Sequence, residues 1–434
     1  MEKDKSLEPY IDDNYQFPKF NRSMVKDHTI LIPSMLDIHM ALFEGVLTQA
    51  GYKVEICKNE GKDVVETGLK YVHNDTCFPA LLVIGQFIDN LNHRTDHDKL
   101  VLLITQTGGG CRASNYIHLL RKALIKAGYG FIPVLSLNAA NLEKDAGLDI
   151  TFNLIKKVVA AMTYGDHLMY LRNKTRSYEK NIGDTKNLVD SWVKKLLDQF
   201  KINKGISYRA LKKNLNLIAK DFGKLDLDLS HAKPKVGIVG EIYIKYAALG
   251  NNHLEDFLVS ENAEAMVPGL FGFVFYTLYN GIYDHLLYAR SKKAAIINKF
   301  IIWYLHRREK MMVKAIKKNT NITPMKYFKY TKDMSEGVLD HGVKMGEGWL
   351  LTAEMMELCE TNYDNIICVQ PFSCLPNHIC GKGVMKKIRK TFENANIIAI
   401  DYDPSQTKVN QENRIKLMLS IARERISDDE KAKL

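Results

Sequence analysis

Short apolar runs alternate with amphipathic segments in two parts of this chain. In the first part the runs are HTILIPS, YKVEIC, KLVLLIT and FIPVLSL, and helix-like segments such as FPALLVIGQFIDNL lie between them. In the second part the runs are PKVGIVG, AEAMVPG, NIICVQP and ANIIAIDYD. Alternation of this kind favours parallel sheets that are covered by helices on both faces. We therefore predict an α/β protein with two doubly wound, Rossmann- or flavodoxin-like domains that face a cleft.

The length and the placement of these runs suggest where the domains begin and end. A chain of 434 residues with 46% hydrophobic content can form two or three domains. We expect a polar extension over 1–27, a first α/β domain over 28–150, a basic helical connector over 151–230, and a second α/β domain over 231–434 with a helical insertion at about 271–345.

Neither the N-terminal segment nor the most apolar stretch of the chain indicates export or membrane insertion. The first 28 residues are polar and lack the continuous apolar core of a secretion signal. The most apolar stretch, MVPGLFGFVFYTLYNGIY, is interrupted by proline, glycine and asparagine before it reaches the length of a membrane span. We expect a cytoplasmic protein whose cysteines are not paired in disulfides.

The net charge of +11 is concentrated in two segments. Residues 156–224 carry 16 Lys or Arg against 6 Asp or Glu, and residues 290–318 carry 10 against 1. The rest of the chain is therefore net negative. A solvated helical face explains such segments, and so does a docking surface for an acidic redox partner or for the phosphates of a coenzyme A-like ligand. Nucleic acid is not expected as a partner, because no zinc-finger, helix-turn-helix or RNP pattern accompanies the charge.

Three of the seven cysteines stand where an apolar run gives way to a turn and a new helix. They are Cys77 in NDTCFPALLVIGQ, Cys111 in QTGGGCRASN and Cys374 in QPFSCLPNH. Thiolates are the usual ligands of iron-sulfur clusters, and βα loops at the carboxyl edge of a parallel sheet line its binding crevice. Three ligands would leave one iron of a 4Fe-4S cluster open to a substrate. The spacing alone does not distinguish a cluster from zinc.

The other cysteines have simpler explanations. Cys57 ends the run VEIC, Cys368 lies inside NIICVQP, and Cys359 falls on the helix-like stretch EMMELCE. Free cysteine is also a small buried hydrophobe, so we interpret these three as packing residues.

Several longer strings resemble a known family. NDTCFPALLVIGQ, QTGGGCRASNYI, VGIVGEIYIKY, GEGWLLTAEM and QPFSCLPNHICGKG resemble, in this order, the 2-hydroxyacyl-CoA dehydratase superfamily. They are most similar to the dehydratase-like region of the large acyl-CoA dehydratase activase-related proteins. The resemblance extends from about residue 30 to 420. It implies that Cys77, Cys111 and Cys374 hold a 4Fe-4S cluster, and a larger iron-sulfur cluster stays open. Cys380 departs from the family pattern, and is either a fourth ligand or an additional thiol near the cluster.

Polar and small residues near these cysteines are the remaining site candidates. Glycines before Cys111 allow the main chain to approach a cluster closely, and the GK[ST] ending of a phosphate loop is absent. His378 is the candidate proton donor, with a capping or surface role as the alternative. Glu241 follows a strand and is either a base or a helix N-terminal acid. The candidates for substrate contact or support of the cluster are Asn74, Asp75, Gln106, Gly109, Gly110, Arg112, Asn115, Gln370 and Asn377.

The resemblance also implies a mechanism and partners. Related dehydratases receive one electron from a separate ATP-hydrolysing iron-sulfur activator and pass it to a thioester substrate, which then expels a hydroxyl group. This chain has no ATP-binding motif of the activator type, so the activator is expected in trans, together with a homodimer or a heterodimer with a homologous subunit. We expect an iron-sulfur enzyme of anaerobic metabolism that acts on a small substrate such as an acyl-CoA. The alternatives are a non-catalytic electron carrier or activation factor, and a zinc-stabilised structural protein.

Overall fold

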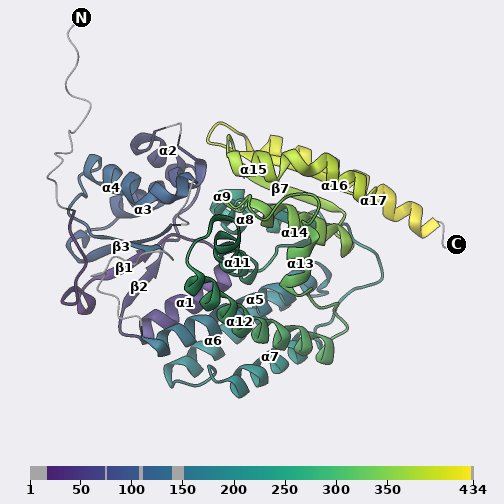
Figure 1. Ribbon diagram of the computed structural model, residues 1–434, viewed down its shortest axis with the longest axis horizontal. Helices are drawn as coiled ribbons and strands as arrows, with labels where there is room; N and C mark the ends of the chain where they lie inside the picture. The colour runs from purple at the N-terminus through teal and green to yellow at the C-terminus, as the bar shows by residue number, and fades with distance from the viewer. Residues whose placement is uncertain (1–16, 74–75, 107–110, 139–150, 432–434) are drawn as a thin grey trace, which may run out of the picture. The chain divides into compact units, whose positions relative to one another are not determined.

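The first predicted α/β domain contains a four-stranded, all-parallel sheet in the order β2-β1-β3-β4 (Figure 1). Its strands are β1 (Thr29–Ile32), β2 (Lys53–Ile56), β3 (Leu100–Gln106) and β4 (Val134–Asn138). Its helices are α1 (Asp37–Gln49), α2 (Lys62–Tyr71), α3 (Phe78–Asn92) and α4 (Tyr116–Lys126), with a short 3-10 helix, η3 (Arg112–Asn115), before α4.

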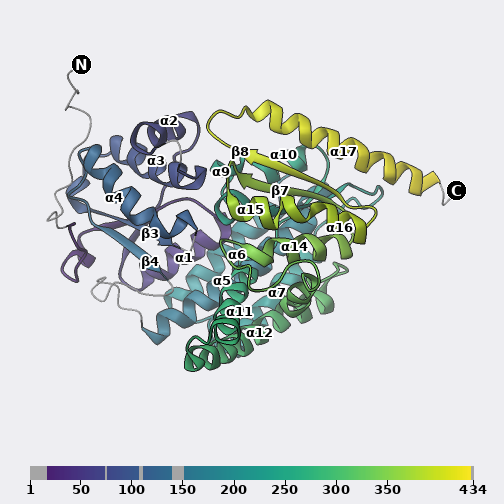
Figure 2. The same ribbon diagram turned by 45° about the horizontal axis from the view of Figure 1, so that its top comes forward.

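The second sheet is also four-stranded and all-parallel, in the order β6-β5-β7-β8. Its strands are β5 (Lys235–Gly240), β6 (Glu264–Met266), β7 (Asn365–Pro371) and β8 (Asn396–Tyr402), and Figure 2 shows β8 beside β7. In each sheet the third strand of the set pairs with the first, so both sheets repeat one topology. The predicted fold class is confirmed: the protein is α/β with two Rossmann-like parallel sheets.

The helices that follow the first sheet all belong to the second of the two units into which the chain divides. They are α5 (Phe152–Thr175), α6 (Asp184–Lys201), α7 (Tyr208–Phe222), α8 (Ile242–Tyr246), α9 (Ala248–Asn251), α10 (Leu254–Ser260), α11 (Leu270–Tyr288), α12 (Lys292–Asn319), α13 (Phe328–Met334), α14 (Gly348–Glu360), α15 (Leu375–Cys380), α16 (Met385–Thr391) and α17 (Lys408–Lys431).

The structure, a computed structural model, describes residues 17–73, 76–106, 111–138 and 151–431. The chain forms two units, one of Met1–Met35 with Leu47–Thr151 and one of Leu36–Val46 with Phe152–Leu434. The helices of the segment predicted as a connector, α5 to α7, belong to the second unit. Most of α1 belongs to it as well, because buried His39 bonds to Asp166 of α5 at 2.8 Å.

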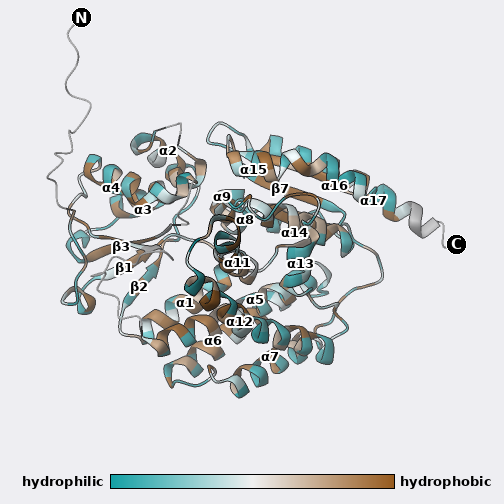
Figure 3. Cartoon of the chain, in the orientation of Figure 1, coloured by the Kyte–Doolittle hydropathy of each residue, from teal (hydrophilic) through white to brown (hydrophobic). Residues whose placement is uncertain are grey.

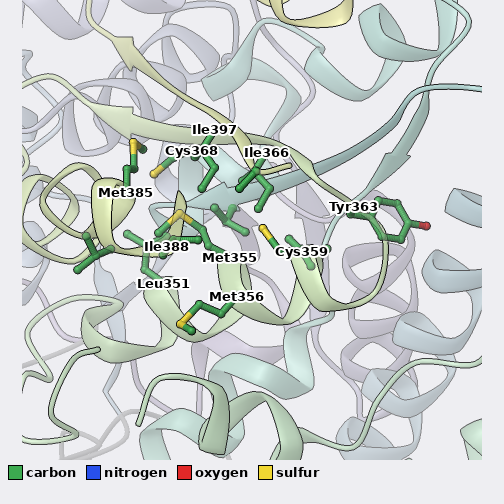
Figure 4. Packing of buried hydrophobic residues seen from close by; sticks show 14 of the residues in the cluster. Leu351, Met355, Met356, Cys359, Tyr363, Ile366, Cys368, Met385, Ile388 and Ile397 are labelled. Carbon is green, nitrogen blue, oxygen red and sulfur yellow. The ribbon is translucent and has the colours of Figure 1, made fainter. Parts of the chain in front are cut away.

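Hydrophobic residues are frequent on strands such as β1, β3 and β7, whereas most helices alternate between hydrophobic and hydrophilic residues (Figure 3). In the second unit, a buried cluster joins β7 and β8 to α14 and α16, with Met355, Ile366 and Ile388 at its centre (Figure 4). Cys359 and Cys368 lie inside this cluster, and Cys57 is fully buried in the first unit. The interpretation of these three cysteines as packing residues is confirmed by their burial.

Candidate functional site

The seven cysteines fall into two groups by burial. Cys57, Cys359, Cys368 and Cys380 are buried, whereas Cys77, Cys111 and Cys374 are half-buried. Burial raises the thiol pKa to about 12 in Cys57, Cys359 and Cys368 and to about 11 in Cys380. A thiolate is the form that binds metal, and such pKa values leave almost none at neutral pH. The three predicted ligands, Cys77, Cys111 and Cys374, thus do not belong to the buried group.

The three half-buried cysteines share one local geometry. Each precedes a helix as its N-cap in an extended backbone conformation, with φ/ψ of −63°/145° for Cys77, −82°/149° for Cys111 and −70°/107° for Cys374. Proline in the first turn of α3 and of α15 fixes the start of those helices. In none of the three does the sulfur cap the following helix. Each of these cysteines therefore places its sulfur atom at the start of a helix, where an extended segment ends.

One part of the sequence interpretation is wrong for Cys77. We expected all three cysteines on βα loops, but Cys77 follows α2 and precedes α3, so it lies on a connection between two helices. The segment KDVVETGLKY forms α2, and its buried residues, Val64 and Gly68, are four positions apart on one helix face. Cys111 and Cys374 do follow strands, β3 and β7 respectively.

Sheet topology gives Cys111 and Cys374 equivalent places. In the order β2-β1-β3-β4, the chain first adds β2 on one side of β1 and then crosses to add β3 on the other side. In the order β6-β5-β7-β8, β6 and β7 lie on opposite sides of β5 in the same way. Open α/β sheets bind ligands outside the carboxyl ends of the strands at such a switch point. Cys111 follows the third strand of its sheet, and Cys374 follows the corresponding strand of the other.

In the first unit, a tyrosine connects the two predicted ligand loops. The Tyr116 hydroxyl lies 3.0 Å from the Cys77 sulfur, and Tyr116 begins α4 directly after the 3-10 helix that Cys111 caps. The structure thus brings the Cys77 and Cys111 loops together. Sequence reasoning missed Tyr116, although its position within QTGGGCRASNYI was a usable signal.

The other candidates of the first unit are less informative. Gln106 ends β3 in register with Asn138 of β4. Arg112 and Asn115 are exposed on η3, where Asn115 is also the N-cap of α4. Four candidates lie outside the described residues: Asn74, Asp75, Gly109 and Gly110.

In the second unit, Asn377 and His378 hold the Cys374 turn. The Cys374 sulfur lies 3.4 Å from Asn377 Oδ1, and buried Asn377 donates from Nδ2 to the Val369 carbonyl of β7 at 3.3 Å. His378 Nδ1 donates to the Cys374 carbonyl at 2.9 Å, which leaves Nε2 as the other ring nitrogen. Both residues therefore fix the backbone around Cys374.

The side-chain oxygen of Gln370 is buried and accepts no hydrogen bond within the described part of the chain. The Gln370 side chain is fully buried at the end of β7, and Nε2 donates to Asp401 of β8 at 2.5 Å. Its Oε1 has no hydrogen-bond partner among the residues that the structure describes. Buried amide oxygens are nearly always satisfied, so this one is suited to accept a hydrogen bond from a bound molecule.

Two carboxylates meet at the end of β5. Glu241 is the N-cap of α8 and accepts from the Ile244 amide at 2.8 Å, while Glu347 accepts from the Ile242 amide at 2.9 Å. The Glu241 amide donates to the Val369 carbonyl at 3.2 Å, beside the strand that leads to Cys374. Glu241 therefore acts as a helix N-terminal acid, one of the two roles predicted for it.

Burial, and then the nearby charge of Glu347, raise the pKa of Glu241 to about 8. A carboxyl group with this pKa holds its proton at neutral pH, so Glu241 can also donate one. Glu347 was missed by sequence reasoning, although the string GEGWLLTAEM drew attention to its segment.

We expect the second unit to lose stability as pH rises from 5 to 8.5. The native state keeps the Glu241 proton up to about pH 8, whereas the unfolded chain releases it near the ordinary glutamate pKa of 4.5, so stability falls across this window. Glu241→Gln should remove the contribution of this carboxyl group to the fall in stability, on the order of 4 kcal/mol, because one pKa unit corresponds to about 1.4 kcal/mol. Thermal unfolding at both pH values measures this, with Glu393→Gln as an exposed control on the same unit. An identical pH response in Glu241→Gln and the parent contradicts the assignment.

The comparisons with known proteins add no family. No family model matches this chain, and no curated protein matches it. Across the described parts of the chain, no helix is both long and apolar enough to pass through a membrane. Within the same residues, no three His, Cys, Asp or Glu side chains are placed as ligands of a single metal ion.

Proposed function

We propose that this protein is an iron-sulfur protein of the kind that 2-hydroxyacyl-CoA dehydratase subunits represent, with Cys77, Cys111 and Cys374 as the ligands of a 4Fe-4S cluster. One observation carries the proposal: of the seven cysteines, these three alone are half-buried, and each is an extended N-cap. The donor set consists of thiols, which suits iron-sulfur chemistry better than oxygen-ligated metals. The sequence resemblance names the same three residues.

A cluster with three protein thiolates supplies an electron and an iron atom with an open coordination position. The protein's own groups at the end of β5 and β7 would handle the substrate. Gln370 Oε1 would accept a hydrogen bond from the substrate, and Glu241, which holds a proton at neutral pH, would donate one to a departing hydroxyl group. Asn377 and His378 act as positioning residues for Cys374.

The proposal includes the partners that the resemblance implies. An ATP-hydrolysing iron-sulfur activator would supply the electron in trans, a second subunit of the same or a homologous chain would complete the enzyme, and the substrate would be small, such as an acyl-CoA. The reducing cytoplasm of an anaerobic cell is the compartment in which such a cluster persists.

Anaerobic purification followed by iron and sulfide analysis tests the proposal. We expect about four iron and four sulfide per chain and a broad visible absorbance that dithionite bleaches. One colourless zinc per chain, with no sulfide, would instead identify a structural zinc protein. ATP-dependent reduction with the activator, followed by turnover of an added 2-hydroxyacyl-CoA, separates an enzyme from an electron carrier, which would be reduced without turnover.

A further inference from the structure

The second unit contains a cavity of about 220 Å³ that is separate from all seven cysteines. Helices α5, α11, α12, α13 and α14 line it, together with the segment that follows β6. Its walls are largely apolar and include Met169, Met266, Phe271, Phe275 and Met312. A cavity of about 150 Å³ is enough to bind benzene, so this one can hold a somewhat larger organic molecule.

Two carboxylates in the wall of this cavity lack a cationic partner. Glu309 of α12 is 5% exposed and accepts from the Phe328 amide at 2.6 Å and from His306 Nδ1 at 2.8 Å. Glu357 of α14 accepts from the Thr331 hydroxyl at 2.5 Å. Within the described residues, neither carboxylate has a Lys or Arg nitrogen within 4.0 Å. Burial lowers the pKa of His306, so this ring stays neutral and does not balance Glu309.

The other acids of the wall differ, because each has its own partner. Glu354 lies 3.2 Å from Lys245, and Asp166 bonds to His39 and to two amides at the start of α11. Among the lysines of the wall, Lys174 is 3.0 Å from Glu264. Lys326 also lines the cavity and acts electrostatically on Glu357, but it forms no ion pair with Glu357 within 4.0 Å. Glu309 and Glu357 are therefore two acids of the wall without an ion pair to Lys or Arg in the described part of the chain, and they act electrostatically on each other.

Aromatic rings complete the chemistry of the cavity. Phe275 and Phe328 stack with centroids 5.1 Å apart, and both line the cavity. Ring faces and carboxylates both attract organic cations and disfavour anions, and of the two carboxylates here Glu309 is buried and Glu357 half-buried. We propose that this cavity binds a small organic ammonium ion with an apolar body, and that Glu309 and Glu357 are its counter-charges. This site is independent of the proposed cluster.

Benzylamine is a suitable probe, because its ring can pack against the apolar wall and its ammonium group can pair with Glu309 and Glu357. We expect calorimetry at pH 8 to show that benzylamine binds at least about 10-fold more tightly than benzyl alcohol, which has the same shape without the charge. Benzoate should bind more weakly than either. Equal binding of the amine and the alcohol, preference for benzoate, or no binding of benzylamine up to about 10 mM overturns the proposal.

Variants assign the effect to the two acids. Glu309→Gln and Glu357→Gln should each weaken benzylamine binding by about 10-fold and leave benzyl alcohol unchanged, because the amide keeps the shape and loses the charge. Glu360→Gln, on the exposed side of α14, is the matched control and should change neither. Met312→Trp should fill the cavity and abolish both. Binding that persists in Met312→Trp, or that ignores both acid variants, places the ligand elsewhere.

The pH dependence has a definite sign. Burial is the main cause that raises the pKa of Glu309 to about 8 and that of Glu357 to about 7, so both are partly protonated at pH 7 without ligand. Binding of a cation favours the ionised forms, so affinity for benzylamine should rise from pH 6 to pH 8 and protons should be released. The charged or titratable groups that also act on these two acids are Asp166, Glu354, Lys310 and Lys326, together with neutral His306. Unchanged affinity between pH 6 and pH 8 contradicts the role of the two acids.

Discussion

Replacing Cys77, Cys111 or Cys374 singly by serine is expected to remove most of the iron from anaerobically purified protein. Each substitution deletes one of only three thiolate ligands, and a serine hydroxyl is a poor replacement for a thiolate at a cluster. The other four thiols cannot substitute readily, since burial raises their pKa to between about 11 and about 12. Iron and sulfide analysis of each variant, at matched protein concentration, gives the result.

The controls for this experiment are the packing cysteines. Cys57→Ala and Cys368→Ala remove fully buried thiols and should keep the iron content of the parent, although both should lower stability. Cys380→Ala decides whether Cys380 is a fourth ligand of the cluster or an additional thiol near it. The Cys380 side chain belongs to the buried hydrophobic cluster that joins β7 and β8 to α14 and α16, so we expect the iron to stay. Unchanged iron in any one of the three serine variants removes that cysteine from the site, and lost iron in Cys380→Ala adds a fourth ligand.

Gly240→Ala is expected to destabilise the second unit by about 3 kcal/mol or more. Gly240 ends β5 with φ of +145°, a conformation that residues with a Cβ rarely adopt. A Cβ at this position would also collide with the Val369 carbonyl oxygen of β7, which is backbone and cannot rotate away. The strands β5 and β7 would have to separate at the edge where Glu241 and the Cys374 turn begin.

Gly337→Ala is the matched control for this substitution. Gly337 also has positive φ, at +77°, but nothing lies within 4 Å of the added Cβ. This variant should therefore show only the conformational cost, about 1 kcal/mol. Thermal unfolding of both variants measures the difference. Equal losses of stability would mean that the Val369 contact does not constrain Gly240.

Periodicity predicted the strands well because their environment is uniform. Parallel strands that helices cover on both faces are continuously apolar, and HTILIPS, KLVLLIT and NIICVQP all became β-strands. The helix α2 was missed, because its sequence KDVVETGLKY is mostly polar and only Val64 and Gly68 are buried. That omission led to the wrong assignment of Cys77 to a βα loop.

The site was only partly accessible to sequence reasoning, for a physical reason. Residues near a motif in sequence, such as Gln370, Asn377 and His378, can be proposed from their neighbours. Glu347 lies more than a hundred positions from Glu241, and only the fold places the two acids side by side. Glu309 was the single acid in a basic segment, which was a signal. Only the fold, in which it accepts from the Phe328 amide at the start of α13, shows that it lines a cavity.

A crystal structure of the anaerobically purified protein, with anomalous scattering recorded at the iron absorption edge, tests the central claim most directly. We expect one iron-sulfur cluster bonded to the sulfur atoms of Cys77, Cys111 and Cys374. Iron bonded to other side chains, or a single metal ion without sulfide at these cysteines, would contradict the account.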